Sequence, residues 1–166
     1  MKDSKRLLIA VDDSEVSHKA VAYVSAMIDS RPGYFVCLLH GLPPVPPVEH
    51  GGAEDPLLEK ILDANLQKKR AEWLSHEREL AQPMVEKAKA VLRGAGLSED
   101  AVTARFVSAS DVDALATEIL AAARGENCDT IVVGRETFRG LDEIFRHHVA
   151  DALIRRGQGY TIWVVE

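Results

Sequence analysis

Two polar segments of the chain carry side chains that could bind or transform a ligand. Asp12 directly follows an apolar run at residues 5–11, and a loop with Gly134, Arg135 and Arg139 follows a second apolar run at residues 129–133. A carboxylate at a strand end is well placed to contact a ligand, and equally well placed to satisfy backbone N–H groups at the start of a helix. The sequence leaves both roles open for Asp12.

Basic side chains gather after the second of these runs. They are Arg135, Arg139, Arg146, His147 and His148. Arginine binds phosphate through a rigid fork of donors, so one interpretation of this cluster is an anion site. The alternative is a solvated loop and helix face, which is the usual place of arginine in proteins.

The familiar catalytic and metal-binding motifs are missing from the sequence. It has no Gly-Lys-Ser/Thr phosphate loop, no G-x-G-x-x-G and no G-x-S-x-G nucleophile elbow. His147 and His148 are adjacent and would project about 100° apart on a helix, so we expect no metal site there. His18 and His40 show no ligand spacing, and we expect them on the surface or in loops.

The elements that would position these side chains alternate between strand and helix. Continuous apolar runs predict five strands, at residues 5–11, 34–39, 101–107, 129–133 and 160–165. Apolar residues spaced by three and four predict four helices, at residues 16–28, 56–92, 112–123 and 142–156, the third capped by Ser110 or Asp111. This alternation predicts an α/β fold in which a doubly wound, Rossmann-like parallel sheet carries helices on both faces.

Such a sheet binds its ligands at the carboxyl ends of the strands, where the winding reverses. If the first and fourth strands are neighbours, residues 11–14 and 134–140 lie near one another. The two polar segments would then form one crevice.

The connection after the second strand and the helix that follows it are unusual. Residues 41–56 hold four prolines and three glycines before Pro56, which predicts a long loop without regular structure. In the following helix Trp73, Leu80, Met84, Ala88, Val91 and Leu92 form a stripe that we expect to pack against the sheet. Pro83 is expected to kink or interrupt this helix, and Gly94 and Gly96 to end it.

Composition narrows the function classes. With 166 residues, 46% of them hydrophobic and 28% charged, residues 1–166 are expected to form a single globular domain. The formal net charge of −6 argues against nucleic acid as the main partner, and no apolar run approaches the length of a membrane helix. Cys37 and Cys128 have no metal-ligand spacing and are predicted to be buried, reduced thiols. The charged start of the chain does not resemble a secretory signal, so we expect a cytoplasmic protein.

Two stretches of the sequence resemble the universal stress protein family. IAVDDSEVSHKAV at residues 9–21 and TIVVGRETFRGLDEIFRHHVADALI at residues 130–154 carry the resemblance, which extends over essentially the whole chain. Val11, Asp12, Ser14, Ser17 and Ala20 match the family pattern, whereas Asp13 stands where glycine is usual. The resemblance implies the strand order 3-2-1-4-5 and a homodimer through the last strand. That interface would comprise Thr161, Ile162, Trp163, Val164 and Val165, an apolar edge without protective charges or proline.

The phosphate-binding motif that the resemblance implies is incomplete in this sequence. ATP-binding members of the family carry a glycine, two residues, a glycine, nine residues, and a glycine followed by Ser or Thr. Here only Gly134 matches, because the later positions are Thr137, His147 and His148; Gly140 is also family-like. Glycines let backbone N–H groups approach phosphate and permit positive φ, whereas a β-branched threonine resists both.

We therefore expect a non-enzymatic, homodimeric stress-response protein with unknown protein partners and no ATP cofactor. The alternative is an adenine-nucleotide-binding switch or weak ATPase that uses Val11, Asp12 and the Gly134 loop, with Arg or His side chains replacing the glycines. In the family the carboxylate corresponding to Asp12 would lie near adenine or ribose. An enzyme for a phosphorylated small molecule is a third class, for which the sequence offers no catalytic constellation.

Overall fold

The computed structural model describes residues 4–47, 54–138 and 148–166, and it shows a five-stranded sheet. The strands are β1 (Lys5–Val11), β2 (Tyr34–Leu42), β3 (Val102–Ser108), β4 (Thr130–Gly134) and β5 (Thr161–Val165). All neighbouring strands are parallel, in the order β3-β2-β1-β4-β5. The predicted fold class and strand order are confirmed.

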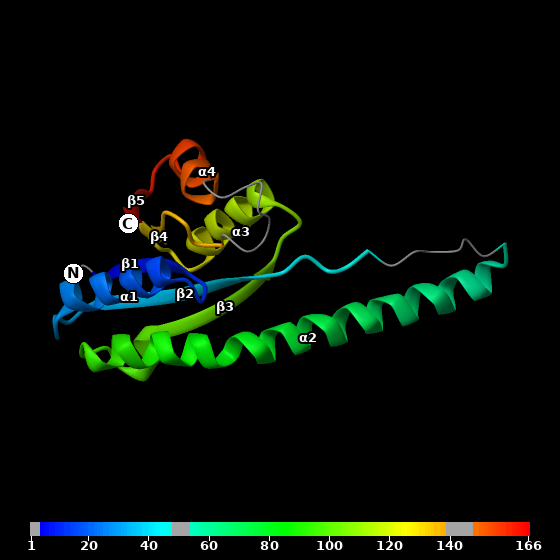
Figure 1. Ribbon diagram of the computed structural model, residues 1–166, viewed down its shortest axis with the longest axis horizontal. Helices are drawn as coiled ribbons and strands as arrows, with labels where there is room; N and C mark the ends of the chain where they lie inside the picture. The colour runs from blue at the N-terminus through cyan, green and yellow to red at the C-terminus, as the bar shows by residue number, and fades with distance from the viewer. Residues whose placement is uncertain (1–3, 48–53, 139–147) are drawn as a thin grey trace.

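Helices cover both faces of the sheet, with α3 and α4 on one side and α2 on the other (Figure 1). They are α1 (Glu15–Ile28), α2 (Pro56–Gly94), α3 (Val112–Gly125) and α4 (His148–Arg156), and a short 3₁₀ turn (Glu99–Ala101) precedes β3. The predicted start of the fourth helix, residues 142–147, lies outside the described residues.

Strand β1 is buried on both faces, as its continuous apolar sequence predicts. Leu8 and Ala10 pack into the core beneath α3 and α4, whereas Leu7, Ile9 and Val11 pack into the core shared with α1 and α2. The central strand therefore holds its carboxyl end, and Asp12 beyond it, in a fixed place.

Strand β2 is longer than the sequence predicts, because it continues past residue 39 to Leu42. Gly41 and Leu42 are still paired with Val107 and Ser108 of β3. This pairing with a neighbouring strand outweighs the local signal of His40 and Gly41, so the irregular connection begins only at Pro43.

Helix α2 has 39 residues and runs without interruption through Pro83, so the expected interruption is wrong. Proline removes one helical hydrogen bond, and because Pro83 is exposed, water can serve the carbonyl group that loses its partner.

Only the second half of α2 is anchored in the core, through Val85, Ala88 and Leu92. Trp73 is half-buried and belongs to neither core cluster, and Leu80 is exposed, so the predicted packing of the whole stripe on the sheet is wrong. The first half of α2 instead projects beyond the carboxyl ends of the strands (Figure 1). Among the described residues, no helix is long and apolar enough to cross a membrane.

Candidate functional site

The carboxyl ends of β1 and β4 lie side by side at the point where the strand order reverses. Asp12 follows β1, and residues 135–138 follow β4. The structure thus brings Asp12 and the start of the Gly134 loop together, as the sequence predicts.

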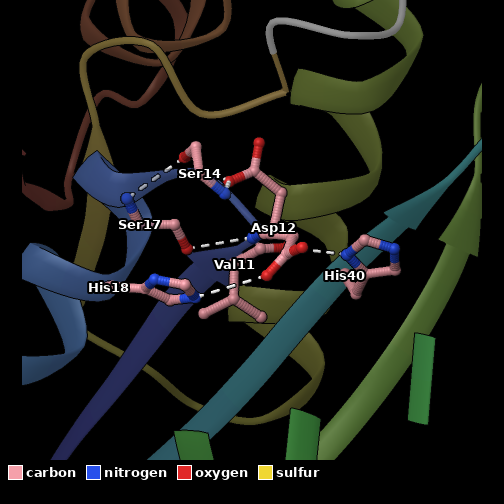
Figure 2. A network of polar contacts seen from close by, with 7 residues as sticks. Val11, Asp12, Ser14, Ser17, His18 and His40 are labelled. Atoms are coloured by element: carbon pink, nitrogen blue, oxygen red, sulfur yellow. Dashed lines mark hydrogen bonds and ion pairs between the residues drawn. The ribbon is translucent and has the colours of Figure 1, made fainter. Parts of the chain in front are cut away.

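Both carboxylate oxygens of Asp12 already have partners within the chain. Oδ1 accepts hydrogen bonds from the Ser14 backbone N–H, at 3.0 Å, and from the Ser14 hydroxyl, and Oδ2 accepts one from the Phe138 backbone N–H, at 2.5 Å. The backbone N–H of Asp12 donates to Ser17 Oγ at 2.9 Å (Figure 2). The turn role that the sequence left open for Asp12 is therefore present in the structure.

Ser14 completes the start of α1. Its backbone is extended, and its hydroxyl accepts a hydrogen bond from the Ser17 N–H at 3.2 Å, which is the usual geometry of a helix cap. Asp12, Ser14 and Ser17 thus form one local network that fixes the turn between β1 and α1.

Phe138 is a residue of this crevice that the sequence reasoning missed. Its side chain is 7% exposed and packs in the core cluster that contains Leu115, and its backbone lies in the left-handed region with φ of 69°. A Cβ added to Gly41 would lie 3.2 Å from Cε1 of the Phe138 ring, so the ring closely approaches the end of β2. The loop sequence gave no signal for this, because an aromatic residue rarely adopts positive φ.

His40 lies at the end of β2 and not on a free surface, so the expectation for it is wrong. Its Nδ1 donates a hydrogen bond to the Val11 carbonyl at 2.8 Å (Figure 2). Its ring centroid lies 6.2 Å from that of Phe106 and 6.4 Å from that of Phe138. His40 therefore links β1, β2, β3 and the loop after β4.

Gly134 is the last residue of β4 and packs tightly against α1. A Cβ at this position would lie 2.7 Å from Val16 Cγ1 and 2.5 Å from Thr137 Oγ1. The Thr137 N–H donates a hydrogen bond to the Gly134 carbonyl at 3.1 Å, and Thr137 Oγ1 is buried and has no hydrogen-bond partner among the residues that the structure describes. The side chain of Thr137 thus occupies space beside the one motif glycine that remains.

The side chain of Arg135 forms an ion pair with Glu166. Its guanidinium lies 2.5 Å from the Glu166 carboxylate and its backbone N–H donates to the Val165 carbonyl. The expected positions Arg139, Gly140, Arg146 and His147 lie outside the described residues. His148 begins α4, and its side chain is also outside them. Of the predicted basic cluster, the structure therefore describes only the side chain of Arg135.

A small apolar cavity of about 80 Å³ lies between α1 and α2, beside Val11 and Asp12. His18 lines it, and its Nε2 lies 3.6 Å from an Asp13 carboxylate oxygen (Figure 2). This volume holds a few water molecules and is far smaller than a nucleotide pocket.

The cysteines are free and buried, as predicted. Burial raises the pKa of the Cys37 thiol, and it raises the pKa of Cys128 to about 12. Both therefore remain protonated at neutral pH. Within residues 4–47, 54–138 and 148–166, no group of three or more His, Cys, Asp or Glu side chains is arranged to hold a metal ion.

The residues predicted for the dimer interface form β5, at one edge of the sheet. Thr161 is exposed, and the four residues that follow it are half-buried. Trp163 makes an edge-to-face contact with the exposed Tyr23 of α1, with ring centroids 6.1 Å apart. The strand carries no charged side chain, whereas β3 at the opposite edge carries Arg105.

Comparison with known proteins agrees with this architecture. The model of the universal stress protein family matches residues 4–159. The solved structure of the hypothetical protein MJ0577 is 21% identical, with a TM-score of 0.67 over 98% of this chain and 96% of that one. A universal stress protein in complex with cAMP is 16% identical, with a TM-score of 0.59 over 99% and 98% of the two chains.

A universal stress protein from Archaeoglobus fulgidus, in complex with dAMP, is 14% identical, with a TM-score of 0.57 over 99% of both chains. None of the curated proteins searched matches the sequence.

Proposed function

Because the chain belongs to the universal stress protein family, we propose that it is a non-enzymatic, homodimeric stress-response protein that does not bind ATP through the usual family loop. The observation that carries this proposal is the contact between Asp12 and Phe138. The Phe138 N–H donates a hydrogen bond to one carboxylate oxygen of Asp12, and the Phe138 ring fills space at the end of β2. The chain itself thus occupies the place where a sheet of this type receives its ligand.

A ligand entering this crevice would have to displace Phe138. Exposing a buried phenylalanine ring costs about 1.5–3 kcal/mol, and relief of the left-handed backbone at Phe138 would return about 1–2 kcal/mol. The loss of the hydrogen bond to Asp12 adds to the cost. The closed arrangement is therefore favoured unless the ligand makes contacts of its own.

The phosphate end of such a ligand would also meet an altered loop. Thr137 places a branched side chain beside Gly134, and Arg135 is paired with Glu166. Neither residue offers phosphate the bare backbone N–H groups that glycines provide.

Homodimerisation through β5 rests on the contrast between the two sheet edges. An edge strand without charges tends to pair with another strand, and β5 is such an edge. Exposed Tyr23 and Ile154 come from α1 and α4, two helices that both contact β5, and would enlarge the apolar surface. A two-fold pairing of β5 strands would bury these groups.

The alternative, a nucleotide-binding switch or weak ATPase, is favoured by two observations. The similar structures described as complexes with cAMP and dAMP show that the fold accommodates adenine nucleotides in those proteins. Phe138 has a strained, left-handed backbone, and the buried Thr137 hydroxyl has no hydrogen-bond partner within the described part of the chain. Opening of the loop would relieve both. In this alternative, the loop would open when the nucleotide binds.

Thermal unfolding with and without MgATP distinguishes the two functions, together with mass analysis of the purified protein for bound nucleotide. MgATP at a concentration of a hundred times its Kd would stabilise the fold by about 2.7 kcal/mol. For a chain of this size, that raises the midpoint of thermal unfolding by roughly 5–10 °C. We expect no such shift and no bound nucleotide. A shift of that size, or a nucleotide that co-purifies, would overturn the proposal and support the switch.

A further inference from the structure

The part of α2 that precedes its anchoring residue Val85 carries apolar side chains that the rest of the described chain leaves uncovered. Leu58, Ile61 and Leu80 are 49%, 51% and 63% exposed. The helix extends away from the sheet in this region (Figure 1). Large exposed apolar residues on a projecting helix point to an interaction surface.

These residues belong to a longer exposed stripe with a regular spacing of three, four and four residues. We call it the α2 stripe: Leu58, Ile61, Asn65, Lys69, Glu72, His76, Leu80 and Pro83, all of them exposed. Eleven residues make close to three turns of an α-helix, so residues that repeat with this period stay on one straight face.

We infer that the α2 stripe pairs with the same stripe of a second copy of this chain, in antiparallel orientation. A two-fold axis between Arg70 and Ala71 matches the eight positions with one another. Leu58 then meets the partner's Pro83, Ile61 meets the partner's Leu80, Asn65 meets the partner's His76, and Lys69 meets the partner's Glu72. Each contact occurs twice, as in any two-fold interface.

The chemistry of the stripe selects this partner and this orientation. In the antiparallel arrangement, apolar residues meet apolar residues at both ends, and opposite charges meet near the centre. In a parallel pair, Lys69 would face the partner's Lys69, and Glu72 would face the partner's Glu72. The repulsion between these like charges disfavours the parallel pair.

The charges at the centre are available for this contact. Lys69 makes no ion pair with any residue that the structure describes, and Glu72 pairs only loosely with Lys68, at 4.0 Å, where both side chains are exposed. An exposed ion pair of this kind is weak and exchanges readily.

The contact is elongated and narrow. Leu58 and Pro83 are 25 residues apart, about 37 Å along the helix. Such an interface is smaller than that of a permanent dimer, so the association should depend on protein concentration. It lies apart from β5, and a chain that uses both surfaces builds assemblies larger than a dimer.

Sedimentation velocity over about a hundredfold range of protein concentration tests the inference. The variants are Lys69→Glu and Glu72→Lys, each of which places like charges opposite one another twice. We expect the wild-type protein to reach twice the mass of either variant at high concentration. We also expect an equimolar mixture of the two variants to recover the wild-type mass, because every contact between them again joins opposite charges.

A matched pair of substitutions to glutamine on exposed apolar residues of α2 provides the control. Ile61→Gln should lower the association at least tenfold, whereas Ala71→Gln, about 130° around the helix from the centre of the stripe, should leave it unchanged. Far-UV circular dichroism checks that α2 remains folded in each variant.

The result that overturns the inference is equal mass for the wild-type protein and both charge variants, or a mixture that fails to recover the association. A Trp163→Glu background keeps this outcome separate from dimerisation through β5. In that background the doubling should persist and should still be lost in Lys69→Glu.

Discussion

Phe138 combines a buried ring with a backbone conformation that disfavours every residue except glycine. The ring packs near Leu115 and Gly41, while φ is 69°. A left-handed backbone costs a residue with a Cβ about 1–2 kcal/mol relative to glycine. Burial of the ring therefore stabilises the fold, whereas the backbone conformation of the same residue destabilises it, and substitutions can separate these two contributions.

The first prediction concerns that separation. Phe138→Ala should lower the free energy of unfolding by about 3–5 kcal/mol, because it removes the ring and keeps the strain. Phe138→Gly removes both, so it should be about 1–2 kcal/mol less destabilising than the alanine variant. Urea unfolding of the three proteins measures the difference. An alanine variant as stable as the glycine variant, or more stable, would contradict the left-handed backbone at this residue.

The roles of individual side chains were only partly predictable from the sequence. Asp12 was placed at the crevice because a polar residue after a buried strand has few other positions. Phe138 and His40 were missed, since their contacts depend on how far β2 extends and on a turn that local propensity disfavours. Long-range packing decides such residues, and short sequence windows do not contain it.

At the scale of the element, α2 is the part of the molecule that departs most from expectation. Pro83 lies inside the helix, exposed, and the chain continues as helix for eleven residues to Gly94. Proline in a helix interior is about 3 kcal/mol less favourable than alanine. Packing of Val85, Ala88 and Leu92 in the core offsets this cost.

Pro83→Ala should therefore stabilise the protein. The new backbone N–H completes the helical hydrogen-bond ladder, and we expect the free energy of unfolding to rise by about 1–3 kcal/mol. Chemical denaturation gives this quantity, and Ala90→Pro, in the same helix, is the opposite control. A decrease in stability on removing Pro83 would show that the helix needs a bend there.

Asp111 caps α3 and provides a pH-dependent prediction. Its carboxylate accepts a hydrogen bond from the Ala114 N–H at 2.8 Å and one from the Ser110 hydroxyl, and these interactions lower the pKa of Asp111. A folded-state pKa below the unfolded one stabilises the fold at neutral pH. This stabilisation is lost as the pH falls through the lowered value.

Asp111→Ala should accordingly lower the midpoint of thermal unfolding at pH 7, and the difference from the wild-type protein should shrink below about pH 4. Melting curves of the two proteins at a series of pH values measure it. If the difference is the same at every pH, the ionised carboxylate is not what stabilises the start of α3.

Strand and helix periodicity predicted the order and type of the five strands and of the helices α1 to α4, because buried parallel strands are continuous apolar runs, but it did not predict the 3₁₀ turn before β3. It did not predict where β2 ends or how α2 lies. Trp73 and Leu80 share the helical spacing of Ala88 and Leu92, yet only the latter two reach the core. Periodicity identifies a face of a helix and does not say how much of the helix has a neighbour.

At the scale of the whole molecule, the two sheet edges are unequal. Arg105 on β3 forms an ion pair with Glu126, at 2.5 Å, so the β3 edge carries charged side chains. Strand β5 has Ile162, Trp163, Val164 and Val165 in sequence and no charge. This asymmetry is the reason why we propose that two copies pair through β5 and not through β3.

Trp163→Glu should abolish the proposed β5 dimer, because two such strands would bring like charges together at a two-fold axis. Light scattering after size exclusion should then give half the wild-type mass at low concentration, where the α2 stripe contributes little. Thr103→Glu, at the exposed edge of β3, is the control and should leave the mass unchanged. A monomeric wild-type protein would disprove the β5 interface.

The two protonated cysteines have a consequence for how the protein behaves under oxidation. Hydrogen peroxide attacks thiolates and not thiols, and it requires access to the sulfur. Cys37 and Cys128 offer neither, since both are buried and the pKa of each is raised. Both thiols should therefore remain unoxidised when the folded domain is exposed to peroxide. Any response of this protein to oxidants must then begin outside its own thiols.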